Sequence, residues 1–198
     1  MTSRYPVAAR CGKMCAFTMS ISTTNGDDGK TQVITGGRVW KDDPRVAACG
    51  ELDELGSWLG VVASFMPPEH ADQRERIAAI QRELFAIGAL LQAAGFDLFG
   101  NSTFDTPRLD AWVLEFETTL PRLRGFVIQG GQPATAFAHV ARTVCRRVER
   151  SLTSLLRMAE TDDAIHRLQL ISIHLNRLAD WLFLLADFLE TPNKKVPQ

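Results

Sequence analysis

The chain has 198 residues, of which 45% are hydrophobic and 23% charged, so it has the length of one domain and can bury a core without disulfide or metal staples. Lys and Arg number 22 against 23 Asp and Glu, and this formal net charge of −1 argues against a dedicated nucleic-acid-binding protein. No run of about 18 apolar residues is present, so no transmembrane helix and no membrane partner are expected.

The two ends of the chain differ in composition from its middle. The segment 1–21 carries three basic residues and no acidic one, and it lacks a helical pattern. We expect a disordered leader there, although the same composition suits an organelle transit peptide. The protein is therefore expected in the cytoplasm, with the mitochondrial matrix as the alternative. The tail, residues 191–198, is rich in Pro and Lys and is expected to fray, which leaves one domain over residues 22–190.

The four cysteines are Cys11, Cys15, Cys49 and Cys145. Their spacing matches neither a zinc ribbon nor a dense disulfide framework. We expect reduced thiols, as in a protein from a reducing compartment.

The predicted elements begin with an extended loop. Residues 22–45 are rich in Gly, Thr, Asp and Lys, which predicts a loop with at most a short strand at 32–35. After it, apolar residues recur at helical spacing. Pro67 and Pro68 end the first helix, and Thr106 with Pro107 is expected to cap the third. The predicted helices cover residues 46–65, 71–93, 106–121, 134–158 and 162–189.

The last predicted helix is apolar nearly all round, which is typical of a helix at the centre of a bundle or at an interface. Five helices without strand–helix alternation predict an all-α fold. We expect a five-helix bundle of the ferritin-like up-and-down kind, preceded by an extended Gly-rich loop.

The Gly-rich segment, TTNGDDGKT at residues 23–31, is the first candidate site. Its small and hydroxylated residues suit a loop that wraps a phosphate chain with backbone N–H groups. Only two residues separate Gly26 from Gly29, and no helix follows, so the segment is not a P-loop. An ordinary polar turn is the alternative.

The fourth predicted helix carries the second candidate site. Arg142, Arg146, Glu149 and Arg150 share one helical face, and guanidinium groups there suit a polyphosphate. Glu149 would pair with an arginine or hold a metal ion or a ribose. The alternative is a solvated, salt-bridged helix face.

Asn176 and Asp180 form the third candidate, one turn apart in the most apolar helix. We expect them to be buried, and buried polar groups must find hydrogen-bond partners. A ligand site and a network that packs helices together both account for them.

These features occur in an order that resembles the ATP:cob(I)alamin adenosyltransferases of the propanediol-utilisation (PduO) type. The resemblance covers about residues 22–190, nearly the whole domain. Each motif is weak alone, but the set in this order is specific. The matching segments are TNGDDGKT at 24–31, GRVWKDDPRV at 37–46, GELDELGS at 50–57, FVIQGG at 126–131, ARTVCRRVER at 141–150 and LNRLADWLF at 175–183.

The resemblance implies a five-helix bundle that assembles as a homotrimer with its active sites between subunits. The Gly-rich loop of one subunit would fold around ATP, and the Arg/Glu helix of a neighbour would complete the site. The cobalt of cob(I)alamin, a substrate, would attack the 5′ carbon of ATP in the presence of Mg²⁺. Adenosylcobalamin and triphosphate would result. A cobalamin reductase and an adenosylcobalamin-dependent enzyme are the implied protein partners.

The chemistry of the residues agrees with this reaction. Cobalt(I) is itself a strong nucleophile, so the protein supplies positioning and electrostatics rather than a nucleophilic side chain. The triphosphate leaving group calls for Arg, Lys, Mg²⁺ and backbone N–H donors.

The resemblance also assigns roles to individual residues. Phe126 would be a hydrophobic wedge below the corrin that removes the lower ligand of cobalt(II), whereas a core aromatic is the alternative. Asp53 and Arg142 would form an ion pair between subunits. The catalytic set is then Asp53, Phe126, Arg142 and Arg146, the cobalamin-binding residues are Phe126 and Asp180, and Glu149 would bind Mg²⁺ together with the phosphates of ATP. The ATP-binding set is Thr23, Thr24, Asn25, Gly26, Asp27, Gly29, Thr31, Gln32, Lys41, Arg146, Arg147, Glu149, Arg150 and Asn176.

The chain departs from the family pattern in three places, one of which is Gly56, where the family usually has Asn or Ser after Asp-Glu-Leu. The family loop usually begins with Arg or Lys before Thr-Gly-Asp, where this chain has Thr24 and Asn25, and Lys30 is the nearest replacement for that cation. The family usually has Pro before Gly130, where this chain has Gln129. The missing cation supports an alternative function, a noncatalytic trimeric carrier or sensor that binds nucleotide or corrinoid. A plain helical scaffold is a third possibility.

Overall fold

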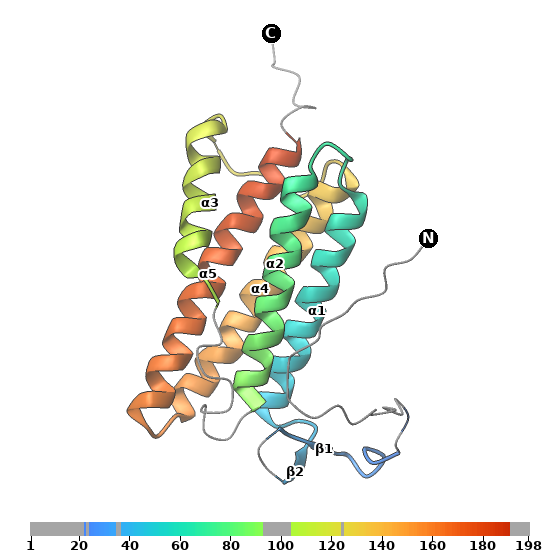
Figure 1. The fold of residues 1–198 in the computed structure, drawn as a ribbon, viewed down its shortest axis with the longest axis vertical. Coiled ribbons are helices and arrows are strands. Elements are labelled where there is room, and N and C mark those ends of the chain that lie inside the picture. The colour runs from blue at the N-terminus through green and yellow to red at the C-terminus, as the bar shows by residue number, and fades with distance from the viewer. Residues whose placement is uncertain (1–21, 23, 35–36, 93–103, 124, 191–198) are drawn as a thin grey trace, which may run out of the picture.

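The structure is a computed structural model, and it describes residues 22, 24–34, 37–92, 104–123 and 125–190. The predicted leader and tail, the candidate residue Thr23, and the thiols Cys11 and Cys15 lie outside the described residues. The described part forms five helices and a two-stranded hairpin, so the predicted all-α bundle is confirmed (Figure 1). The elements are β1 Lys30–Gln32, β2 Arg38–Trp40, α1 Pro44–Phe65, α2 Ala71–Gln92, α3 Thr106–Thr119, α4 Pro133–Met158 and α5 Asp162–Glu190.

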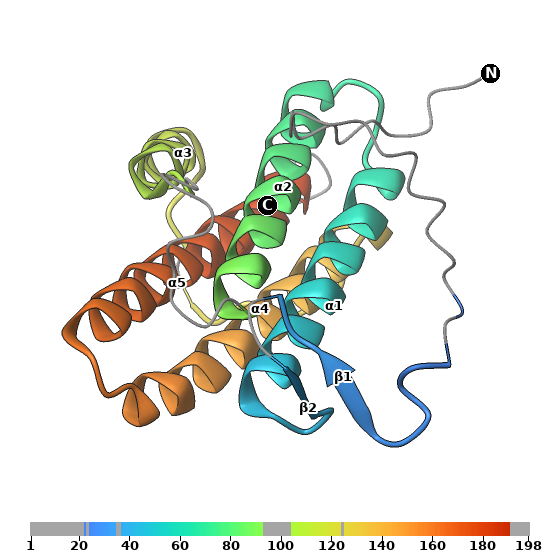
Figure 2. The same ribbon diagram turned by 60° about the horizontal axis from the view of Figure 1, so that its bottom comes forward.

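The helices run alternately up and down along the long axis of the molecule (Figure 1). Helix α1 packs against α2 and α4, and α4 packs against α5. Helix α3 lies on the outside, against α5, and the hairpin lies at the end of the bundle where α1 begins (Figure 2). None of the described helices combines the length and the apolarity needed to cross a lipid bilayer.

Local chemistry sets the helix boundaries. Asp43 caps α1, because its side chain accepts a hydrogen bond from the backbone N–H of Arg45 at 2.9 Å, and Pro44 follows it. Asp105 caps α3 through the N–H of Arg108 at 3.0 Å. The expectation that Thr106 caps this helix is therefore wrong by one residue: a carboxylate next to the helix start takes the N–H instead.

The first strand lies earlier in the sequence than the expected strand at 32–35, and a second strand pairs with it. Strands β1 and β2 pair antiparallel, with Lys30 opposite Trp40 and Gln32 opposite Arg38. Thr35, at the end of the expected strand, lies outside the described residues. The Gly-rich composition concealed β1, since its residues do not alternate between apolar and polar.

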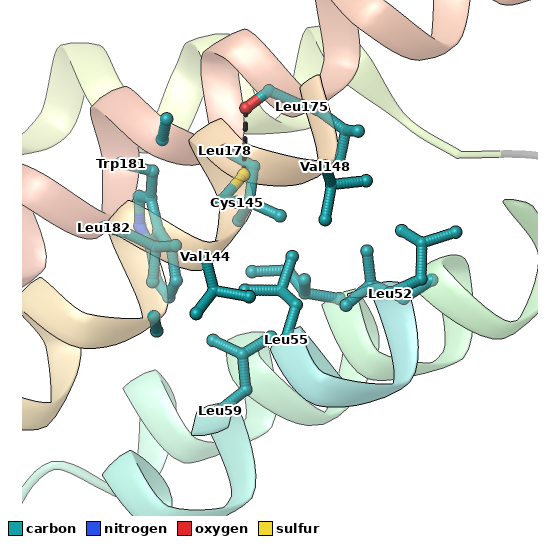
Figure 3. Packing of buried hydrophobic residues seen from close by; sticks show 14 of the residues in the cluster. Leu52, Leu55, Leu59, Val144, Cys145, Val148, Leu175, Leu178, Trp181 and Leu182 are labelled. Carbon is teal, nitrogen blue, oxygen red and sulfur yellow. Dashed lines mark hydrogen bonds between the residues drawn. The ribbon is translucent and has the colours of Figure 1, made fainter. Parts of the chain in front are cut away.

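Residues of all five helices form the core, and Figure 3 shows the part of it where α1, α4 and α5 meet. The Cys145 thiol lies inside it and donates a hydrogen bond to the carbonyl of Leu175 at 3.3 Å, and burial raises its pKa. Cys49 is also a buried free thiol, in agreement with the expected reduced cysteines. Side chains of three helices meet in this part of the core (Figure 3). They are Leu52, Leu55 and Leu59 of α1, Val144, Cys145 and Val148 of α4, and Leu175, Leu178, Trp181 and Leu182 of α5.

Helix α5 is buried along most of its length, between α3 and α4. Leu170 and Ile173 remain exposed on it at 42% and 51%. The helix therefore packs through two neighbours and leaves an apolar strip uncovered within one chain.

Candidate active site

Arg38 closes the Gly-rich turn. Its guanidinium donates to both carboxylate oxygens of Asp28, at 2.9 and 2.5 Å, and to the carbonyl of Asn25. These contacts hold the pKa of the Asp28 carboxyl below its usual value. Gly29 takes a φ of 81° where the turn enters β1, and Thr24 takes a φ of 56°, which is strained for a β-branched residue. The turn is thus held in one shape by an ion pair and two left-handed residues.

The predicted ATP-binding residues of this segment follow the chain around the hairpin. Gly26 lies against Lys41, since a β-carbon at Gly26 would be 3.1 Å from Lys41 Nζ. The Lys30 ammonium lies 4.8 Å from the centre of the Trp40 ring. Lys41, rather than Lys30, is therefore the lysine beside the middle of the turn. The turn contains five of the predicted residues, Thr24, Asn25, Gly26, Asp27 and Gly29. Strand β1 contains Thr31 and Gln32, and Lys41 follows β2.

The arginines of α4 divide between two faces. Arg147 pairs with Glu54 and, at 3.7 Å, with Glu51, so its guanidinium lies among the carboxylates of α1. Arg146 and Arg150 are exposed on another face, and neither forms an ion pair within the described part of the chain. The alternative of a salt-bridged face therefore describes Arg147 and does not describe Arg146 and Arg150.

Glu149 and Asn176 join this face to α5. The Asn176 Nδ2 donates to Glu149 Oε1 at 3.3 Å, and both residues are half-buried. A single oriented carboxylate suits Mg²⁺, which proteins commonly bind through one or two carboxylates together with substrate phosphates. No cluster of three or more His, Cys, Asp or Glu is found among the described residues.

Arg142 is half-buried, and within one chain its surroundings are incomplete. Its guanidinium carbon lies 5.7 Å from the centre of the Phe183 ring, and its buried Nε finds no hydrogen-bond partner among the described residues. Asp53 is exposed on α1, and no ion pair joins the two residues within the described chain. The predicted pairing is between subunits, which one chain does not test.

Phe126 points out of the molecule. Its side chain is fully exposed, and Ile128 is 92% exposed in the same loop. The alternative that Phe126 is a core aromatic is therefore excluded. Gln129, at the position where the family usually has Pro, donates from Nε2 to the carbonyl of Val127 at 3.3 Å.

A cavity of about 280 Å³ lies behind this loop, between it and the adjoining ends of α4 and α5. Thr135 and His139 are buried in it, and one polar atom of each lacks a hydrogen-bond partner among the residues that the structure describes. Burial, with a contribution from Arg142 and an opposing one from Asp187, lowers the pKa of His139. The lining also includes Phe183, Asp187 and Glu190.

Asp180 differs from its prediction. Its side chain is 52% exposed, so the expectation of burial is wrong, whereas Asn176 is half-buried. Asp180 lies in a groove of about 650 Å³ between α3 and α5, where Arg177 bridges it to Asp110. The buried polar residues of α5 are His174 and Asp187. The error has a simple cause. Even a mostly apolar helix has one face exposed to solvent, and helical periodicity alone did not show that Asp180 lies on that face.

Phe183 lines both this groove and the cavity behind the Phe126 loop. The two hollows therefore flank one aromatic side chain beside Arg142. Sequence reasoning missed Phe183 because an aromatic residue in an apolar helix is usually core. It also missed Arg38, although an arginine shortly after two adjacent aspartates was a signal of an ion pair across a turn.

Comparison with known proteins decides the family. The family of cobalamin adenosyltransferases matches residues 21–189. The chain belongs to the cobalamin adenosyltransferase family. A cobalamin adenosyltransferase of Cupriavidus metallidurans is 37% identical to it, with 85% of this chain and 87% of the relative covered. A corrinoid adenosyltransferase of Bacillus subtilis is 33% identical, with 85% of each covered.

Solved structures agree. A variant of the PduO-type ATP:corrinoid adenosyltransferase of Lactobacillus reuteri, complexed with cobalamin and ATP, superposes with a TM-score of 0.75. It is 32% identical in sequence, and the match covers 87% of this chain and 96% of that one. The predicted family, fold and enzyme class are therefore confirmed.

Proposed function

We propose that this cobalamin adenosyltransferase moves the 5′-deoxyadenosyl group of ATP onto the cobalt of cob(I)alamin, on the surface formed by the Phe126 loop, α4 and α5. The observation that carries the assignment to this surface is the full exposure of Phe126, on the loop that borders the cavity between α4 and α5. Phe183 lines the same cavity and lies against Arg142, whose buried Nε has no hydrogen-bond partner among the described residues. An apolar side chain kept in water, on a loop that borders a partly apolar cavity, suits a large, flat, partly apolar substrate.

The reaction balances without a protein nucleophile. Cobalt(I) donates an electron pair to C5′ of ATP, and a cobalt–carbon bond forms while the C5′–O bond breaks. The bonding electrons leave with the triphosphate. Arg146 and Arg150, exposed and free of ion pairs within the described residues, stabilise that charge, and Lys41 with the backbone N–H groups of the turn positions the phosphates.

Phe126 acts on the cobalt rather than on ATP. Cobalt(II) is hard to reduce while a lower axial ligand donates to it, and an apolar side chain placed below the corrin displaces that ligand. The exposed position of Phe126 suits this role, and Asp180 and Phe183 lie beside the adjoining groove.

Mg²⁺ would be held by Glu149 and the phosphates of ATP, where it would neutralise charge on the leaving group. Asn176 fixes the carboxylate for this purpose, since it donates to Glu149 Oε1 at 3.3 Å. The site then needs nucleotide and metal together.

The active form is a homotrimer. The buried Nε of Arg142 has no partner within residues 24–34, 37–92, 104–123 and 125–190, and Asp53 is exposed, as expected if the two residues meet across an interface. The exposed strip at Leu170 and Ile173 provides apolar surface on the same helix as Asn176.

The chemistry also defines the protein partners and the compartment. Cobalt(I) must come from a reductase, and the product is consumed by an adenosylcobalamin-dependent enzyme. We place the protein in the cytoplasm, because its described cysteines, Cys49 and Cys145, are free thiols and cobalt(I) requires a reducing environment.

The test is anaerobic turnover with chemically reduced cob(I)alamin, ATP and Mg²⁺, followed by the absorbance change on formation of the cobalt–carbon bond. Adenosylcobalamin and triphosphate in equal amounts are expected. A protein whose melting temperature rises with ATP but that forms no product would instead be a carrier or sensor. If the protein shows neither turnover nor stabilisation by ATP, only the helical scaffold remains as an interpretation.

A further inference from the structure

Glu190, the last residue of α5, reaches the start of α4. Its Oε2 accepts a hydrogen bond from the backbone N–H of Gln132 at 3.1 Å. The end of α5 and the beginning of α4 lie at the same end of the bundle (Figure 1). Gln132 is the residue through which the Phe126 loop enters α4.

Helix α4 has no cap of its own. Gln132 occupies the N-cap position but makes no side-chain capping hydrogen bond, and the first turn contains no acidic residue. Pro133 follows, and it has no N–H to donate. The free N–H groups and the positive end of the helix dipole favour a carboxylate at this place, and Glu190 brings one from a different helix.

Gly131 shows how closely the carboxylate is seated. Its φ is 96°, in the left-handed region that favours glycine. A β-carbon at this position would overlap the carboxylate of Glu190. The backbone of the loop and the Glu190 side chain therefore occupy adjoining space that leaves no room for a methyl group.

The loop needs such an anchor, because its tip receives little support from the core. Phe126 is fully exposed and Ile128 is 92% exposed, so neither side chain fixes the backbone by packing. Val127 and Ile128 only border the cavity that Glu190 also lines. The orientation of the loop is consequently set where it joins α4.

We infer that Glu190 is a positioning residue for the reaction: it caps α4 from α5 and thereby fixes the loop that presents Phe126 to the corrinoid. The inference rests on the proposed function, and it adds a residue that acts through the Phe126 loop rather than on the reacting atoms. It requires that loss of Glu190 act on the corrinoid side of the reaction and spare ATP.

The experiment compares the full-length wild type with Glu190→Ala, Glu190→Gln and the control Glu75→Ala, which removes an exposed glutamate of α2. For Glu190→Ala we expect kcat/KM for cob(I)alamin to fall about tenfold while KM for ATP changes less than twofold. Glu190→Gln keeps an acceptor but loses the charge, so its loss is expected to be smaller. Glu75→Ala behaves as wild type.

A spectroscopic signal separates positioning from stability. Electron paramagnetic resonance distinguishes cob(II)alamin that has lost its lower nitrogen ligand from cob(II)alamin that keeps it. With ATP and Mg²⁺ present, we expect a smaller four-coordinate fraction in Glu190→Ala than in wild type. An unchanged fraction, or equal rises in KM for both substrates with a lower melting temperature, overturns the inference.

A double-mutant cycle tests the contact itself. Gly131→Ala is expected to lose activity because its methyl group displaces the Glu190 carboxylate. In a Glu190→Ala background the same change should cost less, since only the backbone conformation remains strained. Strict additivity of the two changes contradicts the inference. An inactive wild type would instead overturn the proposed function, so the two failures are distinguishable.

Discussion

The contacts that Arg142 makes within one chain do not satisfy its guanidinium group. It is half-buried beside Phe183, and its Nε has no hydrogen-bond partner in the part of the chain that the structure describes. A buried guanidinium nitrogen without an acceptor is costly to maintain, which is the physical reason to place a partner in a second subunit.

Arg142→Ala should therefore damage activity far more than loss of an exposed arginine such as Arg122. We expect kcat/KM to fall on the order of 10²-fold or more, because removing one member of a partly buried ion pair leaves the other unpaired. Steady-state kinetics of the purified variants provide the measurement. Comparable activity of Arg142→Ala and Arg122→Ala would refute the role.

Glu149→Gln tests the metal assignment. The amide keeps the size of the side chain but removes the charge that attracts Mg²⁺, so half-maximal activity should require on the order of tenfold more Mg²⁺. KM for cob(I)alamin should stay unchanged. Glu160→Gln, an exposed glutamate beyond the end of α4, is the matched control. An unaltered Mg²⁺ requirement in Glu149→Gln would remove this residue from the metal site.

A buried histidine predicts how stability depends on pH. His174 Nδ1 lies 3.2 Å from the Thr106 hydroxyl and its Nε2 lies 3.6 Å from Glu83. Burial, with repulsion from Arg108 and a small opposing effect of Asp105, lowers the pKa of His174 from 6.5 to about 4. The contact with Glu83 is therefore not an ion pair at neutral pH.

Between about pH 6.5 and 4 the unfolded chain binds a proton at His174 that the folded chain does not, so stability falls as the pH falls. Glu83 acts in the opposite direction, because burial raises the pKa of its carboxyl. The free energy of unfolding, measured with urea at pH 7.5 and at pH 5, should fall between these pH values by about 2 kcal/mol more in wild type than in His174→Gln. Equal losses would contradict the neutral, buried histidine.

Individual side chains were predictable only in part. The pattern that placed Arg146, Glu149 and Arg150 together depends on helical period alone, and these residues do share a region of α4 with Asn176 nearby. Period does not tell how far a helix is covered by its neighbours, so the exposure of Asp180 was missed. Glu190 and Gln132 meet across 58 residues of sequence, and no local pattern announces such a contact.

The Gly-rich hairpin is an element whose shape depends on one side chain. Arg38 holds Asp28 and the Asn25 carbonyl, and it bridges β2 to the turn. Arg38→Ala should raise KM for ATP on the order of tenfold, because the backbone donors of the turn lose their common orientation. The melting temperature should change little, since exposed ion pairs add little stability.

The matched control for this prediction is Arg167→Ala, which also removes an exposed ion pair, with Asp163 at 2.9 Å in α5. Steady-state kinetics and thermal unfolding of both variants provide the comparison. Equal KM values for ATP in the two variants would show that the Arg38 contact does not organise the nucleotide loop.

The helices were predictable as elements, and the hairpin was not. Apolar residues at helical spacing and the prolines at 67–68 mark the helices to within a few residues of their bounds. Strand β1 is only three residues long, and it is set by its register with β2, the left-handed Gly29 and the Arg38 contact. These are tertiary features, which a period-two pattern does not report.

At the scale of the whole molecule, a site shared between subunits predicts complementation. Asp53→Ala and Arg142→Ala should each be nearly inactive alone. Mixed trimers contain interfaces where the intact Arg142 of one subunit meets the intact Asp53 of another, so about a quarter of wild-type activity should return when the two are coexpressed in equal amounts. Coexpression that gives no more activity than either variant alone would place both residues outside a shared interface.

The bundle itself was predictable from the sequence, because five amphipathic helices have few ways to bury their apolar faces. The assembly was not predictable from periodicity. An apolar strip such as Leu170 and Ile173 looks the same in a sequence whether a helix or a second subunit covers it. Only the resemblance to the family suggested a trimer.

The most direct measurement asks which bond of ATP breaks. Wild-type protein is mixed anaerobically with cob(I)alamin, Mg²⁺ and ATP that carries ¹⁴C at the 5′ carbon and ³²P in the γ-phosphate. The proposed reaction sends all transferred ¹⁴C to the corrinoid and all released ³²P to intact triphosphate, in equal amounts. Phosphorus released as orthophosphate with ADP, and no ¹⁴C on the corrinoid, would contradict adenosyl transfer by this site.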